Sequence, residues 1–474
     1  MGLFNVITNN VKAAVGYQQT FEELLASKDV SRAKNFMNDH SIRAEQALLE
    51  YDVETHEVMK RKDKPIYDKK GNFLRFQKRW KIPIPYPAFI NEIALVFLYG
   101  RPVKWLQQSE DTDEAFEAYK NLLKTVRFDA HVREAKRVAG AEETSAILFH
   151  TYRDDEGKPN MLLNVLSKKN NDDIFTIKDQ YGRLKAFAWG YSLKDSGSKT
   201  VYHLDIYTAN TIYRCKRASV GWEVVVMVNA VGKIPVIIFE QELEHNGVQP
   251  MIHRMESMSS TDADVNDRFA NPAMVATAEI LNSLPKAEEE AKLYILKNGG
   301  EVRYLTWDDA SESKKNEYMR LDKHILSKSF TPDVDFDNMK SLSNTSAKAL
   351  KQMMMLAVIK ADKRKETHDG YMNRVASLTK AILGNVLDYP NKAKYEALEI
   401  GHEFQEPFGE DVSATLNDLM KQYETGALSL QTLLEMSYLV KNASVEMDRI
   451  KEEQAEALER QRELNKMDVF GVAD

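Results

Sequence analysis

The sequence predicts a multidomain α+β protein, and three observations lead to this fold class. At about 100–200 residues per domain, the 474 residues correspond to two to four domains. Residues 146–240 consist of short alternating segments rich in β-branched and aromatic side chains, which is the pattern of antiparallel strands. The segments on both sides carry apolar residues at helical spacing instead.

Composition excludes several classes of protein. The net charge is -7, which argues against a strongly basic nucleic-acid binder but leaves room for a local basic patch. Cys215 is the only cysteine, so a disulfide scaffold and a cysteine-rich zinc site are excluded and a reducing compartment is indicated. The best apolar run, Ala94 to Leu98, is far too short to span a bilayer.

The N-terminal third is expected to be mainly helical. Helical spacing covers residues 18–60, and a turn region with Pro65 and Gly71 follows at 62–73. Alternating prolines make residues 82–88 extended, after which a helix starts at Ala88 and ends at Gly100. Residues 101–106 then predict a short strand, and residues 107–138 predict helix.

Beyond the strand-rich block the chain is expected to become helical again. The predicted elements are a helix over 252–270, a hairpin of residues 292–297 and 301–306, a helix over 312–328 capped by Ser311, and a polar loop over 330–345. Residues 346–388 carry the longest helical signal, a rod of ~65 Å or two helices that meet at Gly370. Residues 411–474 predict three helical pieces, two of them capped by Ser429 and Ser444.

No constellation of residues argues for catalysis. The phosphate-binding loop, the dinucleotide turn and the nucleophile elbow are all missing from the sequence. A cluster that begins at His402-Glu403 lacks the second histidine of a zinc protease. The alternating Asp333, Asp335 and Asp337 could hold a divalent ion, but a solvated acidic loop is the favoured interpretation.

A series of landmarks in a fixed order does point to a family. A strand ending in Leu305-Thr306 precedes a helix with Leu321-Asp322, a loop with Pro332-Asp333, and a helix that starts with Ser346 and Ala349-Leu350. Further landmarks lie at 91–105, 232–239 and 426–453. This ordered set resembles the portal proteins of tailed bacteriophages, although Ala347 stands where that family usually has glycine.

The resemblance implies a portal fold with an α+β wing, a helical stem, a small mixed clip, a long shaft helix and a helical C-terminal crown. It also implies a ring, commonly of twelve subunits, at the capsid portal vertex of the virion, assembled in the host cytoplasm. By position, the implied domains are the wing at 1–251 (β-rich from 146 to 240), stem helices at 252–272 and 312–328, the clip at 273–311, the tunnel loop at 329–346, the long helix and wing return at 347–405, and the crown at 406–474.

The implied function is a conduit for packaging and ejecting double-stranded DNA. The implied partners are further copies of the chain, the duplex, the terminase large subunit, a head-completion or tail adaptor protein, and the major capsid and scaffold proteins. No enzymatic activity, cofactor, metal or membrane is expected. The alternatives are a scaffold or minor head protein, and a nuclease or ATPase of the packaging machine.

Two sets of residues are candidates for the channel. Lys340, Lys348 and Lys351 cluster at the junction of the tunnel loop and the long helix. There they would contact DNA phosphates transiently, or would only interact with solvent. The DNA-channel candidates are Lys340, Lys348, Lys351, Lys323 and Lys328. The tunnel-loop candidates are Asp333, Asp335, Asp337, Asn338 and Asn344.

Overall fold

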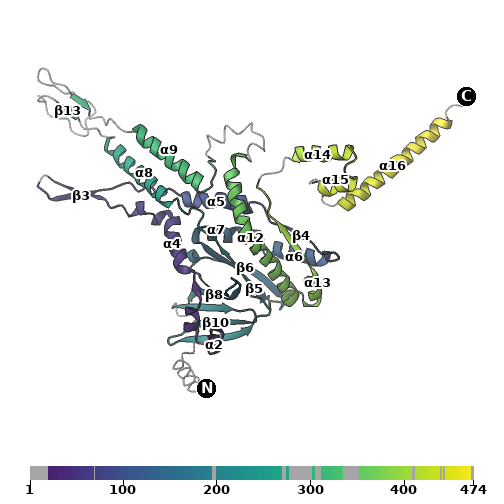
Figure 1. Ribbon diagram of the computed structural model, residues 1–474, viewed down its shortest axis with the longest axis horizontal. Coiled ribbons are helices and arrows are strands. Elements are labelled where there is room, and N and C mark those ends of the chain that lie inside the picture. Colours follow the sequence, from purple (N-terminus) through teal and green to yellow (C-terminus); the bar gives the residue numbers. More distant parts are fainter. Residues whose placement is uncertain are drawn as a thin grey trace. The chain divides into compact units, whose positions relative to one another are not determined.

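The computed structural model describes residues 20–68, 70–194, 199–269, 274–276, 302–304, 311–334, 352–407, 412–437, 440 and 443–470 (Figure 1). These residues fall into two compact units, the larger within 1–335 and 354–407 and the smaller within 336–353 and 408–474. The larger unit contains all the sheets and the smaller one is helical in its described part. No helix of the described residues is long and apolar enough to cross a membrane.

An antiparallel six-stranded sheet forms one layer of the larger unit. Its order is β1-β7-β8-β9-β10-β11, and its strands are β1 (Asn38–Asp39), β7 (Asp173–Lys178), β8 (Leu184–Lys194), β9 (Thr200–Tyr207), β10 (Thr211–Arg217) and β11 (Trp222–Val228). Helices α2 (Phe21–Ala26) and α3 (Val30–Asn35) cover one face with apolar side chains such as Leu24 and Leu25. The buried positions alternate along the strands, so one face of the sheet is apolar core.

A second sheet of three strands lies between that layer and a helical layer. Its order is β12-β5-β6, with β12 (Val236–Glu240), β5 (Thr144–Arg153) and β6 (Pro159–Leu166). Along β5, Ala146 and Leu148 face the six-stranded sheet, whereas Ile147 and Phe149 face the helices. The region predicted as one meander is therefore two sheets that share a core.

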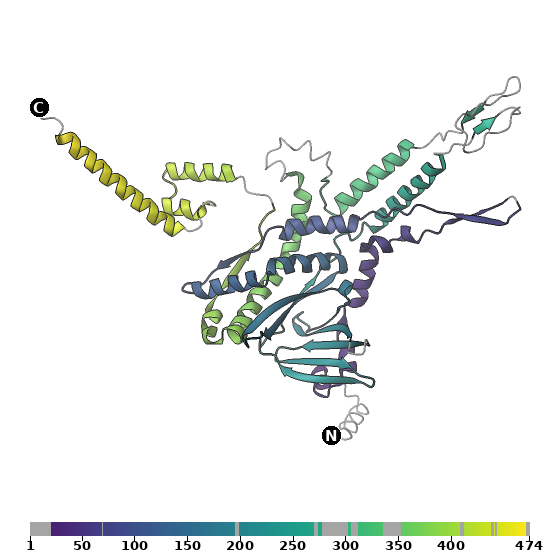
Figure 2. The ribbon, with the colours of Figure 1, turned by 180° about the vertical axis from the view of Figure 1, so that it is seen from behind.

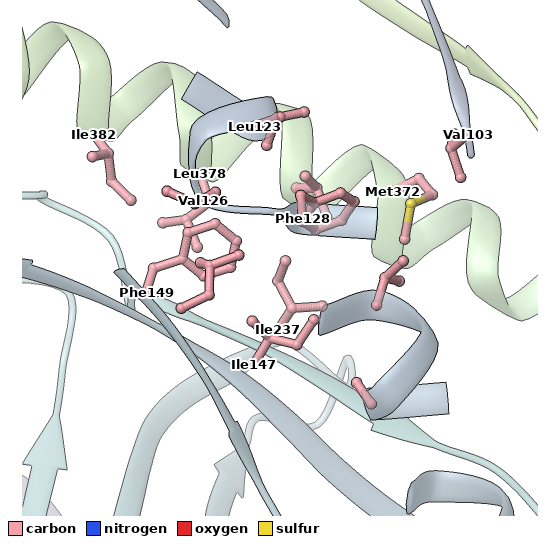
Figure 3. Close-up of a cluster of buried hydrophobic side chains, with 14 of the residues drawn as sticks. Val103, Leu123, Val126, Phe128, Ile147, Phe149, Ile237, Met372, Leu378 and Ile382 are labelled. Carbon is pink, nitrogen blue, oxygen red and sulfur yellow. The ribbon is translucent and has the colours of Figure 1, made fainter. Parts of the chain in front are cut away.

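The largest hydrophobic core lies between the three-stranded sheet and four helices (Figure 3). Those helices are α5 (Tyr86–Tyr99), α6 (Asp113–Thr125), α7 (Phe128–Glu142) and α12 (Met355–Ile382). Met372 and Leu378 of α12 are buried there with Phe128 of α7 and Phe149 of β5, all within a few per cent of full burial. Burying a large apolar side chain is worth roughly 1.5–3 kcal/mol, so this core fixes α12 on the sheet.

The C-terminal end of α12 returns the chain to the N-terminal half. A π-helical turn (Leu383–Leu387), a 3-10 turn (Tyr389–Asn391) and α13 (Lys392–Ala397) lead into β15 (Ile400–Glu403). Strand β15 pairs antiparallel with β4 (Lys104–Gln107), so segments almost 300 residues apart form one small sheet.

Three helices and two two-stranded sheets complete the larger unit. Helices α8 (Gln249–Phe269) and α9 (Ser311–Lys328) run side by side and lead to a two-stranded sheet of β13 (Met274–Ala276) and β14 (Val302–Tyr304) (Figures 1 and 2). Helix α4 (Ser41–Tyr51) and the short turns Val53–Thr55 and Glu57–Lys60 precede an antiparallel hairpin of β2 (Lys64–Tyr67) and β3 (Phe73–Gln77).

The described part of residues 408–474 contains the three helices that were predicted there: α14 (Val412–Glu424), α15 (Leu430–Met436) and α16 (Ala443–Phe470). Gly426, with φ at +74°, forms the turn after α14, and its N–H donates to the carbonyl of Tyr423. The predicted cap Ser429 is confirmed, since its hydroxyl accepts the N–H of Thr432 at 3.2 Å. Ser444 is not a cap, because α16 already begins at Ala443.

Several element boundaries differ from the predictions because local geometry interrupts the periodicity. From residue 20 to residue 60 the predicted helix is divided into α2, α3 and α4. Lys28, with a left-handed φ of +59°, and the cap Asp29 separate α2 from α3, and strand β1 separates α3 from α4. Arg127, at φ +53°, likewise divides the helix predicted over 107–138 into α6 and α7. The expected turn region at 62–73 contains β2 and the start of β3 instead.

Other boundaries moved by one or two residues. Helix α5 begins at Tyr86 rather than Ala88, because a proline in the first helical turn removes an N–H that has no helical partner anyway. Ser311 is the first residue of α9 rather than its cap. Helix α12 runs through Gly370 without a break, and its irregular turn comes later, at 383–387.

Two predictions fall partly outside the described residues. Residues 335–351, which include the predicted start of the long helix, are outside them. So are residues 292–297 of the predicted hairpin, while the described strand at 302–304 pairs with residues 274–276.

Candidate functional site

Helices α8 and α9, here called the stem pair, lie where the sequence predicted helices at 252–270 and 312–328. They run antiparallel, because Arg254 pairs with Glu317 at 2.9 Å while the later Asp262 pairs with the earlier Lys314 at 3.2 Å. At their base, Ile252 and Met255 of α8 and Ile325 of α9 are buried against Ile90 of α5. The pair is therefore anchored by an apolar base and held along its length by ion pairs.

The acidic and basic side chains of α9 are directed differently. Glu317 bonds to α8, and Asp322 accepts a hydrogen bond from the Tyr86 hydroxyl of α5. The predicted channel candidates Lys323 and Lys328 are exposed, and within the described part of the chain neither forms an ion pair. Two acids of α9 are thus held by neighbouring helices, Glu317 in an ion pair and Asp322 in a hydrogen bond, while Glu312 is exposed and Lys323 and Lys328 remain available to a partner.

The structure brings one channel candidate together with a second cation. A shallow surface groove of α9 is lined by Lys323 and Arg320 together with one acid and three uncharged residues, Glu312, Ser313, Asn316 and Met319. Lys328 lies five residues further along, about 140° around the helix from Lys323. The two predicted lysines therefore do not form one cluster.

Of the remaining candidates, Asp333 alone lies within the described residues. Asp333 is described, two residues after the turn that ends α9. Phe330 has a left-handed φ of +55°, and the N–H of Thr331 donates to the carbonyl of Leu326 at 2.9 Å, so a Schellman turn ends the helix. The candidates Lys340, Lys348, Lys351, Asp335, Asp337, Asn338 and Asn344 lie outside the described residues.

A buried ionic cluster behind the stem escaped the sequence analysis. The carboxylate of Glu244 is fully buried and lies 2.6 Å from Lys136 Nζ, 2.9 Å from Lys360 Nζ and 3.3 Å from Arg364 Nε. Burial alone would raise the pKa of Glu244, but these three cations hold it well below its usual range. Burial also lowers the pKa of Lys136 and of Lys360, against the opposing effect of Glu244.

This cluster ties the stem to the core. Lys360 of α12 also donates to the carbonyl of Ser329, the residue that follows α9, and to that of Glu244 before α8, both at 3.0 Å. Lys136 comes from α7, on the face that also buries Val132 and Ala139. A lysine inside an apolar helical stripe was the one sequence signal that could have revealed the cluster.

A second buried pair holds α8 to the N-terminal segment. His56 Nδ1 lies 2.5 Å from Glu256 Oε1, and that oxygen also accepts the N–H of Ile84 at 2.9 Å. Burial would lower the pKa of His56, but its hydrogen bond and attraction to Glu256 raise it overall. Two buried charged contacts therefore hold the base of α8: the pair of Glu256 with His56, and the cluster around Glu244 just before the helix.

The described residues offer no evident centre for chemistry. Within them, no three His, Cys, Asp or Glu side chains gather in a group that could hold a metal ion. His402, at the start of the incomplete zinc-protease pattern, contacts Asp369 of α12 at 2.9 Å. The buried Glu244 cluster and the His56–Glu256 pair position α8, α9 and α12 on the core.

Comparisons with known proteins identify the family of this chain. Residues 34–460 match the family model described as "Phage portal protein, SPP1 Gp6-like". A solved structure described as "Neck of native GTA particle computed with C12 symmetry" is similar, with a TM-score of 0.40 and 10% identity, and covers 75% of this chain and 90% of that chain. The search of curated proteins found no match.

Proposed function

The chain belongs to the SPP1 Gp6-like family of phage portal proteins, and from this membership we propose that it forms a ring of identical subunits, commonly twelve, at the unique vertex of the capsid. Double-stranded DNA would pass through the ring during packaging and ejection. The family match over 34–460 carries the proposal, and it favours a portal over a scaffold, a minor head protein or a packaging enzyme, because the family is structural.

The stem pair supports this function. Helices α8 and α9 are held rigidly at their base, and the exposed lysines of α9 would face the duplex. Each cation that neutralises a phosphate adds affinity, and a ring multiplies the effect by the number of subunits. A conduit must release DNA, so a few cations per subunit on α9 suit it better than a dense basic surface.

We assign the other parts by their order in the family. The wing is 1–251, the stem helices are 252–272 and 312–328, the clip is 273–311, the tunnel loop is 329–346, the long helix and wing return are 347–405, and the crown is 406–474. The clip would dock the terminase large subunit and later the tail adaptor. Lys340, Lys348 and Lys351 would lie near the duplex, beside the tunnel loop with Asp335, Asp337, Asn338 and Asn344.

Photo-crosslinking tests whether DNA threads past α9. Cys215 is 1% exposed, so a Lys323→Cys variant can be labelled selectively with a photoreactive maleimide. A Lys124→Cys variant, labelled on the exposed face of α6, is the matched control. We expect the label at 323 to crosslink to linear duplex DNA but not to a covalently closed circle, which cannot enter a closed ring. Equal crosslinking of the linear and circular forms, or none of either, would overturn the proposal.

A further inference from the structure

The chain is acidic overall, yet one short segment is strongly basic. Residues 60–81, here called the basic ribbon, include ten Lys and Arg residues and only two Asp, whereas the whole chain has a net charge of -7. The basic ribbon contains strands β2 and β3 and the residues on both sides of them. Such a concentration of like charge repels itself, so it is usually retained for a polyanionic partner.

Most of this charge is exposed and not neutralised within the subunit. Seven exposed cations have no ion pair within the described part of the chain: Lys60, Lys62, Lys64, Lys70, Arg75, Lys78 and Lys81. Among the described cations of the ribbon, Arg61 and Arg79 alone reach an acid of α8, Asp264, at 2.9 and 3.8 Å.

Aromatic side chains lie among these cations. Tyr67, Phe73 and Phe76 are each at least half exposed. Their rings contact one another, with centroids 6.2 Å apart for Tyr67 and Phe73 and 4.8 Å apart for Phe73 and Phe76. Cations interleaved with exposed aromatic rings are the composition by which proteins hold nucleic acids, with charge on phosphates and rings on sugars or bases.

The basic ribbon is presented in a fixed form. At its turn, the Asp68 carboxylate accepts the N–H groups of Lys70 and Asn72, both at 2.8 Å. At its base, the N–H of Trp80 donates to Asp264 at 2.7 Å, and the indole of Trp80 donates to Asp267. A partner therefore meets an ordered two-stranded ribbon anchored to α8.

We propose that the basic ribbon is a DNA-binding arm that holds the backbone of duplex DNA without reading its sequence. A two-stranded β-ribbon fits the major groove of B-form DNA, which is about 12 Å wide. This assignment is independent of the proposal that DNA passes through a ring. A dense cationic surface binds DNA tightly, whereas a channel must bind it weakly enough for the duplex to move. Its test measures binding and leaves ring formation as a separate readout.

The test compares two charge-matched variants of the full-length protein. The first carries Lys64→Gln, Lys70→Gln, Lys78→Gln and Arg75→Gln. The control removes three exposed lysines and one exposed arginine from other elements, through Lys124→Gln, Lys185→Gln, Lys363→Gln and Arg101→Gln. Binding to a short linear duplex is measured by fluorescence anisotropy at several salt concentrations, and native mass is measured on the same samples.

Counterion release sets the expected result. Loss of four phosphate contacts should make the slope of log affinity against log salt less negative by about 3–4 and weaken binding at least about tenfold at low salt. The control should bind like the parent protein. An unchanged slope in the ribbon variant would overturn the proposal. So would an unchanged slope with a lowered native mass, which would assign the ribbon to a contact between copies of the chain.

The aromatic rings give a second, independent readout. A variant with Phe73→Ala and Phe76→Ala keeps every cation of the basic ribbon. It should bind DNA several-fold more weakly with the salt slope unchanged, because apolar contacts with the sugars of the backbone release no counterions. Parent-like affinity in this variant would exclude the aromatic contact from the proposal.

Discussion

At the scale of single residues, three hairpin turns are built from one local pattern. In each, an aspartate carboxylate accepts the N–H groups two and four residues later, and a glycine three residues later has φ near +80°. The turns begin at Asp68, Asp154 and Asp179. The aspartate and glycine spacing is visible in the sequence, so these turns were predictable from local chemistry alone.

Two glycine substitutions should have opposite effects on stability. Gly182 has φ +78°, where a Cβ is strained, so Gly182→Ala should lower the free energy of unfolding by roughly 1–2 kcal/mol. Gly370 is helical with open space around it, so Gly370→Ala should raise that free energy by up to about 1 kcal/mol. Denaturant titration of both variants checks the pair, and a loss of stability in Gly370→Ala would contradict the continuous helix α12.

The buried cluster makes a stronger prediction. Glu244→Gln leaves Lys136 fully buried beside two further cations without a carboxylate, so it should reduce stability by ~3–5 kcal/mol. Glu114→Gln breaks an exposed ion pair with Lys394 and serves as the control that should unfold like the parent protein. Equal midpoints for the two variants in thermal unfolding would show that the cluster does not hold the stem.

At the scale of elements, periodicity predicted which segments are helices and strands but not how they are interrupted. The two helices predicted at the stem, the strand-rich block and the three C-terminal helices are all present. The breaks at Lys28 and Arg127 were missed because non-glycine residues in the left-handed region leave no signature in the sequence. The division of the strands into two sheets was missed because a hydrophobic pattern gives strand faces and not partners.

The sequence alone could identify candidate residues that lie within one helix, but not a cluster formed by residues far apart in the chain. Lys323 and Lys328 were identified from the sequence, and the structure places both on the exposed surface of α9. The Glu244 cluster joins residues from α7, α12 and the segment before α8, so no local pattern contains it. Its long-range contacts form only when the helices pack.

Helix α12 also brings a histidine into the core, and this makes stability depend on pH. His368 Nδ1 lies 2.8 Å from the Tyr99 hydroxyl, and burial, with Lys136 and Arg364 nearby, lowers the pKa of His368 to about 3. Burial and Lys360 likewise lower the pKa of His245 to about 4. The unfolded chain, with a histidine pKa near 6.5, therefore binds more protons than the folded chain at mildly acidic pH.

The expected result is a loss of stability on acidification. Between about pH 6.5 and pH 4, each of these histidines should lower the free energy of unfolding by up to about 1.4 kcal/mol per pH unit. In His368→Gln, one proton fewer should be taken up on unfolding, so the free energy of unfolding should depend less steeply on pH. In His324→Gln, which changes an exposed residue, the slope should equal that of the parent protein. Unfolding titrations at four or five pH values check the slopes, and identical slopes in all three proteins would contradict a neutral buried His368.

At the scale of the whole molecule, charge is distributed by role. Glu317 and Asp322 of α9 bond to neighbouring helices within the subunit, Lys323 and Lys328 of α9 are exposed, and the basic ribbon concentrates cations beside α8. In a ring, a heterologous interface covers faces that are exposed in one subunit. The side chains of α16 from Lys451 to Arg460 are exposed in the subunit, and we expect such an interface to cover part of them.

The most direct test of the ring is native mass combined with electron microscopy of the same purified sample. Twelve copies of the 54.3 kDa chain would have a mass of about 650 kDa. We predict closed rings near that mass with a central opening of at least about 20 Å, the width that a duplex needs. Compact particles such as dimers, with no central opening, would contradict the proposal that this portal protein is a DNA conduit.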